Sequence, residues 1–200
     1  NWKAECPQFM AFLTEIFEGD RHRIALVQEW MGYLLIPSTH QQKMLLCVGS
    51  GANGKSVLLT IMTALLGTDN VSTVSPEALN RQFGLSPLEQ KLANIYADCS
   101  ELKNLNEGYL KQLVSGDLMP IEQKYKEPRS FRPTARLVLG MNQLPAFRDD
   151  SSGIYRRMMV LPFNYTVPEH KRNLTLAEDL LAAELDGIFW FACLLYTSPS

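Results

Sequence analysis

The stretch Met44–Gly67, MLLCVGSGANGKSVLLTIMTALLG, joins two apolar runs through a cluster of glycines followed by one lysine and one serine. The first run is short and bounded by glycine, which predicts a buried strand over residues 43–48. The second run predicts a helix over residues 56–66 that ends with a C-cap at Gly67. The stretch therefore predicts a strand, a glycine-rich loop and a helix, with a lysine at the start of the helix.

The loop between this strand and this helix completes the pattern G-x-x-x-x-G-K-[ST]. Glycines let successive backbone N–H groups face one anion, which a Cβ would obstruct, and the helix N-terminus adds partial positive charge. In such a loop we expect Lys55 to reach the β- and γ-phosphates of a nucleotide and the Ser56 hydroxyl to ligate Mg²⁺. No guanine-specific N-K-x-D motif follows, which favours ATP over GTP. The expected nucleotide-binding residues are Gly49, Ser50, Gly51, Ala52, Asn53, Gly54, Lys55, Ser56 and Val57.

An acidic residue lies near the end of another apolar run, LANIYADC, at residues 92–99. A phosphate-binding loop needs a carboxylate to hold Mg²⁺, and the end of a neighbouring strand is the usual position for it. Asp98 meets this requirement and is predicted to be a metal ligand together with Ser56. Glu101 follows shortly afterwards and could orient the attacking water or cap the next turn. Either acid could instead be a solvated surface residue.

Strand-like and helix-like segments alternate along most of the chain. This alternation predicts an α/β fold with a parallel sheet covered by helices on both faces. We expect a helical lead-in over residues 1–40, a core over residues 41–192, and a tail over residues 193–200 that is not native to the domain, because the helical pattern is lost there. Further strands are expected at residues 71–75, 135–141 and 158–163, and further helices at residues 7–18, 20–34, 108–114 and 174–191.

The composition excludes several classes of protein. A formal net charge of −2 over 200 residues gives no overall basic field, so any contact with nucleic acid needs a local patch. The four cysteines are scattered, which argues against a zinc site or a disulfide framework. No apolar run reaches the roughly 18 residues of a membrane span, and no secretory signal is present. We therefore expect the protein in the cytoplasm.

One local basic patch occurs in the segment MPIEQKYKEPRSFRPTAR, residues 119–136. Its cations are interleaved with aromatic residues, a composition typical of surfaces that follow single-stranded nucleic acid. A solvated charged hairpin would have the same composition. The cations are Lys124, Lys126, Arg129, Arg132 and Arg136, and the aromatic residues are Tyr125 and Phe131.

Four segments follow one another in an informative order: GANGKS, LANIYADCSE, LKQLVSGDLMPIEQKYKEPRSFRPTARLVLGMNQLP and YRRMMVLPF. This order resembles the C-terminal helicase domain of phage and plasmid primase–helicases, the group that includes poxvirus and satellite-phage primases. The resemblance covers about residues 6–192 and implies a superfamily three helicase, an AAA+-like P-loop ATPase. It implies ATP and Mg²⁺ as cofactors, single-stranded DNA as a partner and a homo-hexameric ring. It also implies a possible primase domain in the full-length protein, and a phage, plasmid or mobile element in a bacterial host.

The resemblance assigns roles to particular residues. Asp98 would be the motif B acid, where many relatives have Glu. Asn142 would end the motif C strand, touch the γ-phosphate and position water, although it could also be a turn residue. Either Arg156 or Arg157 would be an arginine finger that reaches the neighbouring subunit's nucleotide, and Arg157 is preferred.

A hairpin between motifs B and C would resemble the family's DNA-gripping loop. The expected DNA contacts are Lys124, Tyr125, Lys126 and Arg129. Lys111 and Asp117 also match family positions and could couple the hairpin to the nucleotide. The predicted function is an ATP-dependent DNA helicase domain that moves along single-stranded DNA during replication. The alternatives are a P-loop ATPase that remodels or loads proteins without unwinding DNA, and an inactive nucleotide-binding fragment.

Overall fold

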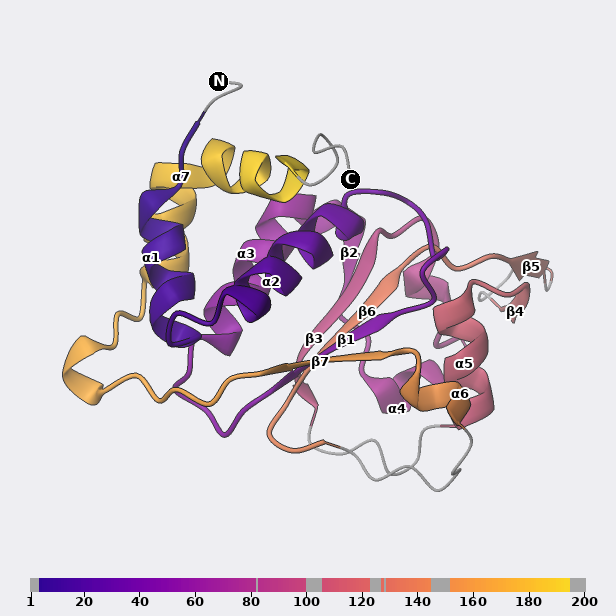
Figure 1. Ribbon diagram of the computed structural model, residues 1–200. Coiled ribbons are helices and arrows are strands. Elements are labelled where there is room, and N and C mark those ends of the chain that lie inside the picture. Colours follow the sequence, from indigo (N-terminus) through magenta and orange to yellow (C-terminus); the bar gives the residue numbers. More distant parts are fainter. Residues whose placement is uncertain are drawn as a thin grey trace.

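The computed structural model describes residues 4–81, 83–99, 106–122, 127, 129–144 and 152–194. Its centre is a five-stranded sheet in the order β2-β3-β6-β1-β7, in which every neighbouring pair is parallel (Figure 1). The predicted parallel sheet is therefore confirmed, although β2 is shorter than expected. The strands are β1 (Met44–Val48), β2 (Val71–Ser72), β3 (Ala93–Cys99), β6 (Arg136–Met141) and β7 (Met158–Pro162).

Helices cover both faces of this sheet, as the alternating pattern predicts (Figure 1). Long helices form one layer, and shorter ones form the other. The first layer consists of α1 (Pro7–Ile16), α2 (Arg21–Leu34), α3 (Lys55–Leu66) and α7 (Leu176–Cys193). The second consists of α4 (Pro76–Leu79), α5 (Glu107–Ser115) and α6 (Ser152–Tyr155).

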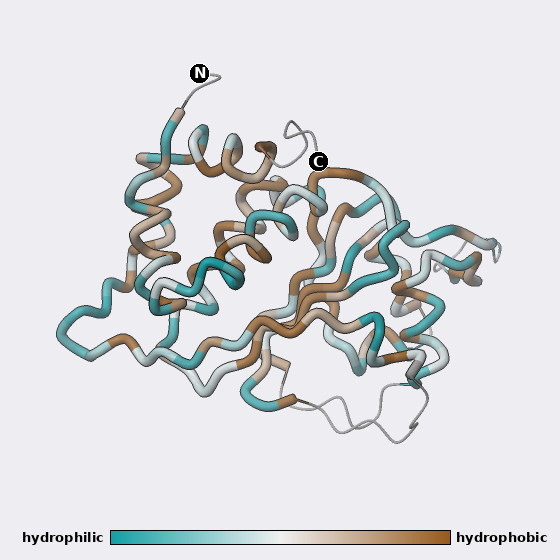
Figure 2. Tube along the Cα trace, in the orientation of Figure 1, coloured by the Kyte–Doolittle hydropathy of each residue, from teal (hydrophilic) through white to brown (hydrophobic). Residues whose placement is uncertain are grey.

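Strand β1 shows why the chain adopts three layers. Leu45 and Cys47 pack with the first helical layer, whereas Met44 and Leu46 pack with the second. Successive side chains of a strand point to opposite faces, so a continuous apolar run fits a strand that is buried on both sides. Figure 2 shows the same hydrophobic centre running through the sheet. Burial raises the pKa of the Cys47 thiol to about 12.

The helical lead-in shares one hydrophobic core with α3 and α7. Asp20 is the N-cap of α2, and its side chain accepts hydrogen bonds from the backbone N–H groups of His22 and Arg23. At the start of α1, the carboxylate of Glu184 in α7 accepts hydrogen bonds from the backbone N–H groups of Gln8 and Phe9, each at 2.9 Å. These N–H groups have no partner within their own helix, so Glu184 acts as a long-range cap.

Several short elements are not predicted by the sequence pattern, including α4, α6 and the 3₁₀ turns η1 (Thr68–Asn70), η2 (Ser86–Leu88) and η3 (Glu169–Lys171). The basic segment contains β4 (Met119–Ile121) and β5 (Arg129–Phe131), which pair antiparallel. This pairing confirms the strands of the predicted hairpin. Within the part of the chain that the structure describes, no helix has both the length and the hydrophobicity to cross a membrane.

Candidate nucleotide-binding site

Close neighbours leave no room for a side chain at either of the two glycines of the pattern, Gly49 and Gly54. Gly54, the N-cap of α3, has a φ of +81°, and a Cβ there would lie 2.7 Å from Cγ2 of Ile16 in α1. At Gly49, a Cβ would lie 2.2 Å from Nδ2 of Asn53 and 2.7 Å from the carbonyl oxygen of Phe163. Side chains are excluded at both positions, so the loop can hold its backbone against one small anion.

Backbone hydrogen bonds attach this loop to the elements around it. The Gly49 N–H donates to the Met141 carbonyl at 3.0 Å, and the Val167 N–H donates to the Ala52 carbonyl at 2.7 Å. The side-chain oxygen of Asn53 accepts from the Lys55 N–H at 3.3 Å. The loop is therefore held by β6 on one side and by the segment after β7 on the other, directly before α3 begins.

Lys55 lies in the floor of the loop, and the residue is only 7% exposed. Its ammonium group donates to the carbonyl oxygens of Gly49 and Met141, each at 2.9 Å. Burial lowers the pKa of Lys55, and the charges of Cys47 and Asp98 act in the opposite direction. An ammonium has three donors, so among the described contacts one is left for an oxygen of a bound anion.

Asp98 lies in an irregular part of β3 beside β6. The pairing register shifts between Tyr96 and Cys99, so a bulge contains Asp98 and exposes its side chain. Gly140 in β6 makes this possible, because a Cβ there would lie 2.5 Å from the carbonyl oxygen of Ala97. The sequence interpretation missed Gly140, although a glycine inside a strand often marks such a close approach.

Ser56 and Asp98 line the same cavity, which has a volume of about 550 Å³. A hydroxyl and a carboxylate are hard oxygen donors of the kind that Mg²⁺ takes, with water and phosphate oxygens filling its other positions. The donor set therefore fits the predicted metal. Glu101, predicted nearby, lies outside the described residues.

Asn142 follows β6, the strand between β1 and β3. It is exposed and comes directly after Met141, whose carbonyl accepts from Lys55. The structure thus brings Asn142 to the carboxyl edge of the sheet, where the phosphate loop and Asp98 also lie. In parallel α/β sheets this edge is where ligands bind.

A second cavity, of about 250 Å³, lies on the other side of Ser56. Its apolar walls come from α1 and from the segment around the start of α7, and cations lie at its rim. Neither wall is suggested by the loop motif, because both come from distant parts of the chain. The apolar lining includes Phe12, Ile16, Val167 and Leu176, and the cations are Lys171 and Arg172.

The predicted arginine pair lies at the opposite edge of the sheet. Arg156 and Arg157 precede β7, which runs parallel to β1, so they are at the amino edge whereas the phosphate loop is at the carboxyl edge (Figure 1). The Arg157 guanidinium donates to the Ser115 hydroxyl at 2.9 and 3.1 Å and to the Gly153 carbonyl at 2.6 Å. The Arg156 residue is exposed.

The predicted DNA contacts are only partly described. Lys124, Tyr125 and Lys126 lie outside the described residues, and Arg129 is in β5, where it pairs with Glu89 at 2.5 Å. Arg132 is exposed and donates to the Gly116 carbonyl at 3.3 Å.

Arg136 does not belong to the basic surface, which corrects the sequence interpretation. It is 2% exposed, and its guanidinium donates to the carbonyls of Leu34, Ile36, Ser38 and Thr134. Its position at the start of β6 faces the end of α2, where helix carbonyls lack partners and attract a cation.

The chain is similar in sequence to known viral proteins. The chain is 28% identical over 167 residues to an inferred helicase of Acanthamoeba polyphaga mimivirus, covering 76% of this chain and 16% of that protein. It is 22% identical over 170 residues to an inferred helicase of Invertebrate iridescent virus 3, covering 80% of this chain and 18% of that protein. The chain thus spans less than a fifth of these relatives.

Solved structures share the fold. The C-terminal region of NrS-1 superposes with a TM-score of 0.76 at 17% identity, covering 96% of this chain and 48% of that one. The JCV helicase bound to a small organic compound superposes with a TM-score of 0.50 at 19% identity, covering 87% of this chain and 55% of that one. These structures share the fold of this chain, and the sequence relatives are inferred viral helicases, which supports the expected resemblance to a helicase domain.

The family match covers the same elements as the candidate site. It begins within β1 and ends at the arginine pair, so it includes the phosphate loop, Asp98 and Asn142. The chain belongs to the family of unknown function DUF5906, whose sequence pattern matches residues 47–157.

Proposed function

We propose that the chain is the motor domain of an ATP-dependent DNA helicase, which hydrolyses ATP with Mg²⁺ and moves along single-stranded DNA. The observation that carries this proposal is the convergence of three groups at the carboxyl edge of the sheet. The Lys55 ammonium lies in the floor of the glycine loop, and Ser56 and Asp98 line one cavity beside it.

The two cavities on either side of Ser56 suggest how ATP would lie. The triphosphate would follow the glycine loop, and the base would enter the 250 Å³ cavity between α1 and the start of α7. Phe12 and Ile16 would contact the apolar base, and Lys171 would face the sugar and phosphates. Lys55 would then direct its remaining donor to a phosphate oxygen.

Ser56 and Asp98 would hold Mg²⁺, which when bound neutralises charge on the phosphates. Asn142 would orient a water, because its amide can donate to a phosphate oxygen and accept from the water. The chain itself would thus provide phosphate binding, metal ligands and water orientation, and the remaining requirement is a cation near the transferring phosphoryl group.

That cation would come from a second copy of the chain. Strand β7 alone spans roughly 13 Å from Met158 to Pro162, and the arginine pair precedes it whereas the phosphate loop lies near its end. Neither arginine is placed to act on its own nucleotide. Arg156 is the better finger, because Arg157 is already bonded to Ser115 and Gly153. Copies arranged head to tail would form the ring.

The segment that joins β4 and β5 in the sequence carries Lys124 and Lys126, and it would contact DNA. Basic residues there would neutralise phosphates without reading sequence. The deciding experiment measures ATP hydrolysis by the chain with and without single-stranded DNA, together with its assembly state by light scattering. We expect hydrolysis to be stimulated by DNA and DNA binding to weaken steeply with salt.

Two variants make this experiment specific. Lys55→Ala should abolish nucleotide binding or turnover. The double change of Lys124 and Lys126 to alanine should weaken DNA binding and leave basal hydrolysis in place. If single-stranded DNA did not change the rate of ATP hydrolysis and the chain did not bind DNA at low salt, the chain would be a P-loop ATPase that acts on proteins. If Lys55→Ala hydrolysed ATP as fast as the unchanged chain, the assignment of the nucleotide-binding site would be wrong.

A further inference from the structure

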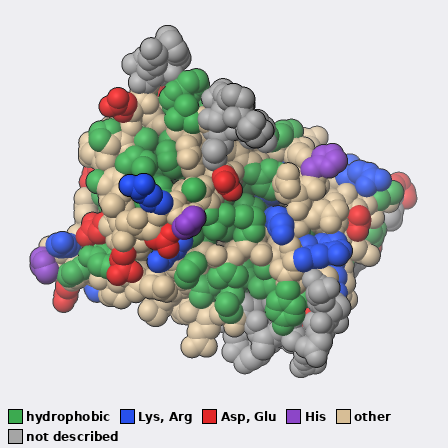
Figure 3. All heavy atoms as spheres, viewed as in Figure 1, with side chains coloured by type: hydrophobic (Ala, Val, Ile, Leu, Met, Phe, Trp, Pro, Cys, Tyr) green, Lys and Arg blue, Asp and Glu red, His purple; other side chains and the backbone are tan. Residues whose placement is uncertain are grey.

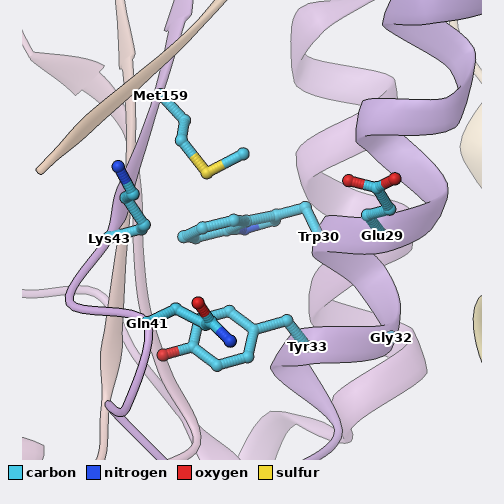
Figure 4. Close-up of a pocket in the computed structure, with 7 residues that line it drawn as sticks. All are labelled: Glu29, Trp30, Gly32, Tyr33, Gln41, Lys43 and Met159. Atoms are coloured by element: carbon cyan, nitrogen blue, oxygen red, sulfur yellow. The ribbon is translucent and has the colours of Figure 1, made fainter. Parts of the chain in front are cut away.

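A cavity of about 440 Å³ lies away from the candidate nucleotide site, between α2 and the starts of β1 and β7 (Figure 4). We call it the Trp30 pocket. The indole of Trp30 reaches across it, with Met159 on one side and Tyr33 and Gln41 on the other. Trp30 and Tyr33 are in edge-to-face contact, with ring centroids 5.6 Å apart. Trp30 itself is only 2% exposed, so an aliphatic side chain that entered the pocket would contact the partly exposed Tyr33 and Met159.

The Trp30 pocket adjoins the arginine pair. The ammonium of Lys43, which lines the pocket, donates to the carbonyl of Arg156. The strand that carries Met159 is an edge strand of the sheet. Figure 3 shows hydrophobic side chains gathered over α2 and β7 on this face. The pocket and Arg156 therefore belong to one continuous surface.

An exposed leucine lies beside the nucleotide cavity at the other side of the molecule. Leu174 is 98% exposed and lines the rim of the 250 Å³ cavity. It follows η3, which protrudes at one end of the molecule (Figure 1). Leaving a leucine in water forgoes the free energy that its burial would release. This position is therefore suited to a contact with another surface.

Arg172 and Glu29 form one complementary pair across the two features, since Lys43 at the pocket already donates to the Arg156 carbonyl and Lys171 lies 3.9 Å from Glu15. Lys171 and Arg172, which precede Leu174, are exposed cations, whereas Glu29 is an exposed carboxylate at the Trp30 pocket. A loop that inserted Leu174 into the pocket would bring these opposite charges together. Complementary charges at the rim of a contact favour the correct orientation of two partners.

We infer that Leu174 of one copy docks into the Trp30 pocket of the next copy, an inference that rests on the proposed function. The proposed ring needs Arg156 of one copy near the nucleotide of its neighbour. The pocket lies beside Arg156, and Leu174 lies beside the nucleotide cavity, so the same head-to-tail contact satisfies both. Because the two features occupy different surfaces, the contact repeats around a closed ring.

Cysteine cross-linking tests this contact. Cys193 is first changed to serine, because it is the partly exposed native thiol among the described cysteines. Gln41→Cys and Leu174→Cys are then combined in one chain and treated with a short bifunctional maleimide, in the presence of Mg²⁺ and a slowly hydrolysed ATP analogue. We expect a ladder of covalent oligomers. Chains with only one of the two cysteines should give no ladder, and their mixture should give dimers.

A charge exchange provides the second measurement. Glu29→Arg or Arg172→Glu alone should weaken association roughly tenfold or more, and the combination should restore it. Leu174→Glu should weaken association by roughly ten- to a hundredfold. If light scattering showed that the chain associates but positions 41 and 174 did not cross-link, the docking contact would be wrong. It would also be wrong if the chain stayed monomeric at all concentrations.

The proposed function is checked separately on Glu29→Arg, whose change lies outside the nucleotide cavities. Binding of a fluorescent ATP analogue by this variant should equal that of the unchanged chain. If the unchanged chain did not bind the ATP analogue, the proposed function would be wrong. A ladder of cross-linked oligomers would in that case still support the docking contact.

Discussion

Ser56 at the start of α3 and Asp98 in the bulge of β3 line one cavity, although they come from different elements. If they hold Mg²⁺ together, Asp98→Asn should lower Mg²⁺-dependent ATP hydrolysis by at least about a hundredfold, since a metal ion supplies several kcal/mol of charge stabilisation. Because Asp98 is exposed, the melting temperature should hardly change. Asp69→Asn, at another exposed acid, is the matched control and should keep full activity. Equal hydrolysis in the two variants would show that Asp98 is no ligand.

Gly140 allows the bulge that contains Asp98 to form. A substitution of Gly140 therefore tests the position of Asp98 without removing its carboxylate. A Cβ in Gly140→Ala would meet the Ala97 carbonyl, and the bulge would have to move. We expect a destabilisation of about 1–3 kcal/mol and a loss of Mg²⁺-dependent hydrolysis greater than the loss of nucleotide binding. Gly108→Ala in the exposed first turn of α5 is the control, with a change within about 1 kcal/mol. Full hydrolysis in Gly140→Ala would contradict this account.

The sequence predicts the parts of the site that depend on local pattern. The strand–loop–helix unit around Lys55 follows from the apolar runs and the glycine spacing, and the strand carrying Asp98 follows from a run of its own. Features formed by distant residues are not predicted. Arg136 looks like part of a basic surface in the sequence, but the end of α2 buries it. The wall of the 250 Å³ cavity is formed by α1 and the start of α7, which are far apart in the sequence.

Burial of Lys55 predicts a pH dependence of stability. Because burial lowers its pKa from the ordinary value of 10.5, the unfolded chain binds this proton more tightly than the folded chain does. As the pH rises toward 10.5, the folded state should therefore gain stability relative to the unfolded state. Lys55→Met lacks this contribution. The free energy of unfolding of the unchanged chain, minus that of Lys55→Met, should therefore increase as the pH rises toward 10.5. Urea unfolding of both proteins at a series of alkaline pH values measures this shift.

The buried thiol of Cys47 titrates in the same alkaline range with the opposite sign, because burial raises its pKa. It is present in both proteins, so its effect should cancel in the comparison to first order. ATP with Mg²⁺ should reduce the pH dependence, since phosphate charge favours the protonated ammonium. A difference that stays constant across the alkaline range would mean that Lys55 is not desolvated in the folded chain.

Arg136 should contribute to stability and not to DNA binding. Arg136→Met removes the guanidinium that satisfies carbonyls at the end of α2 and should destabilise the chain by about 3 kcal/mol. Arg132→Met, at an exposed arginine of the same segment, should cost less than about 1 kcal/mol. Thermal unfolding measures both values. If Arg136→Met were as stable as the unchanged chain and bound DNA less tightly, the sequence interpretation of a basic surface would be right.

The arginine pair and the phosphate loop lie at opposite edges of the sheet, which predicts complementation between copies. Arg156→Ala should lose hydrolysis by a factor on the order of 1,000 or more, and Lys55→Ala should be inactive because its own nucleotide site fails. In a mixture, the intact nucleotide site of an Arg156→Ala copy can receive the arginine of a Lys55→Ala neighbour, so part of the activity should return.

Arg157→Ala provides the comparison for this experiment. Its guanidinium bonds to Ser115 and Gly153 within the same copy, so its loss should lower the melting temperature and should not be rescued by mixing. The readout is ATP hydrolysis as a function of mixing ratio at constant total protein. Activity that peaks at an intermediate ratio requires a site shared between copies. A mixture whose activity never exceeds that of its components would contradict a nucleotide site shared between copies, and with it the role of Arg156 as an arginine finger.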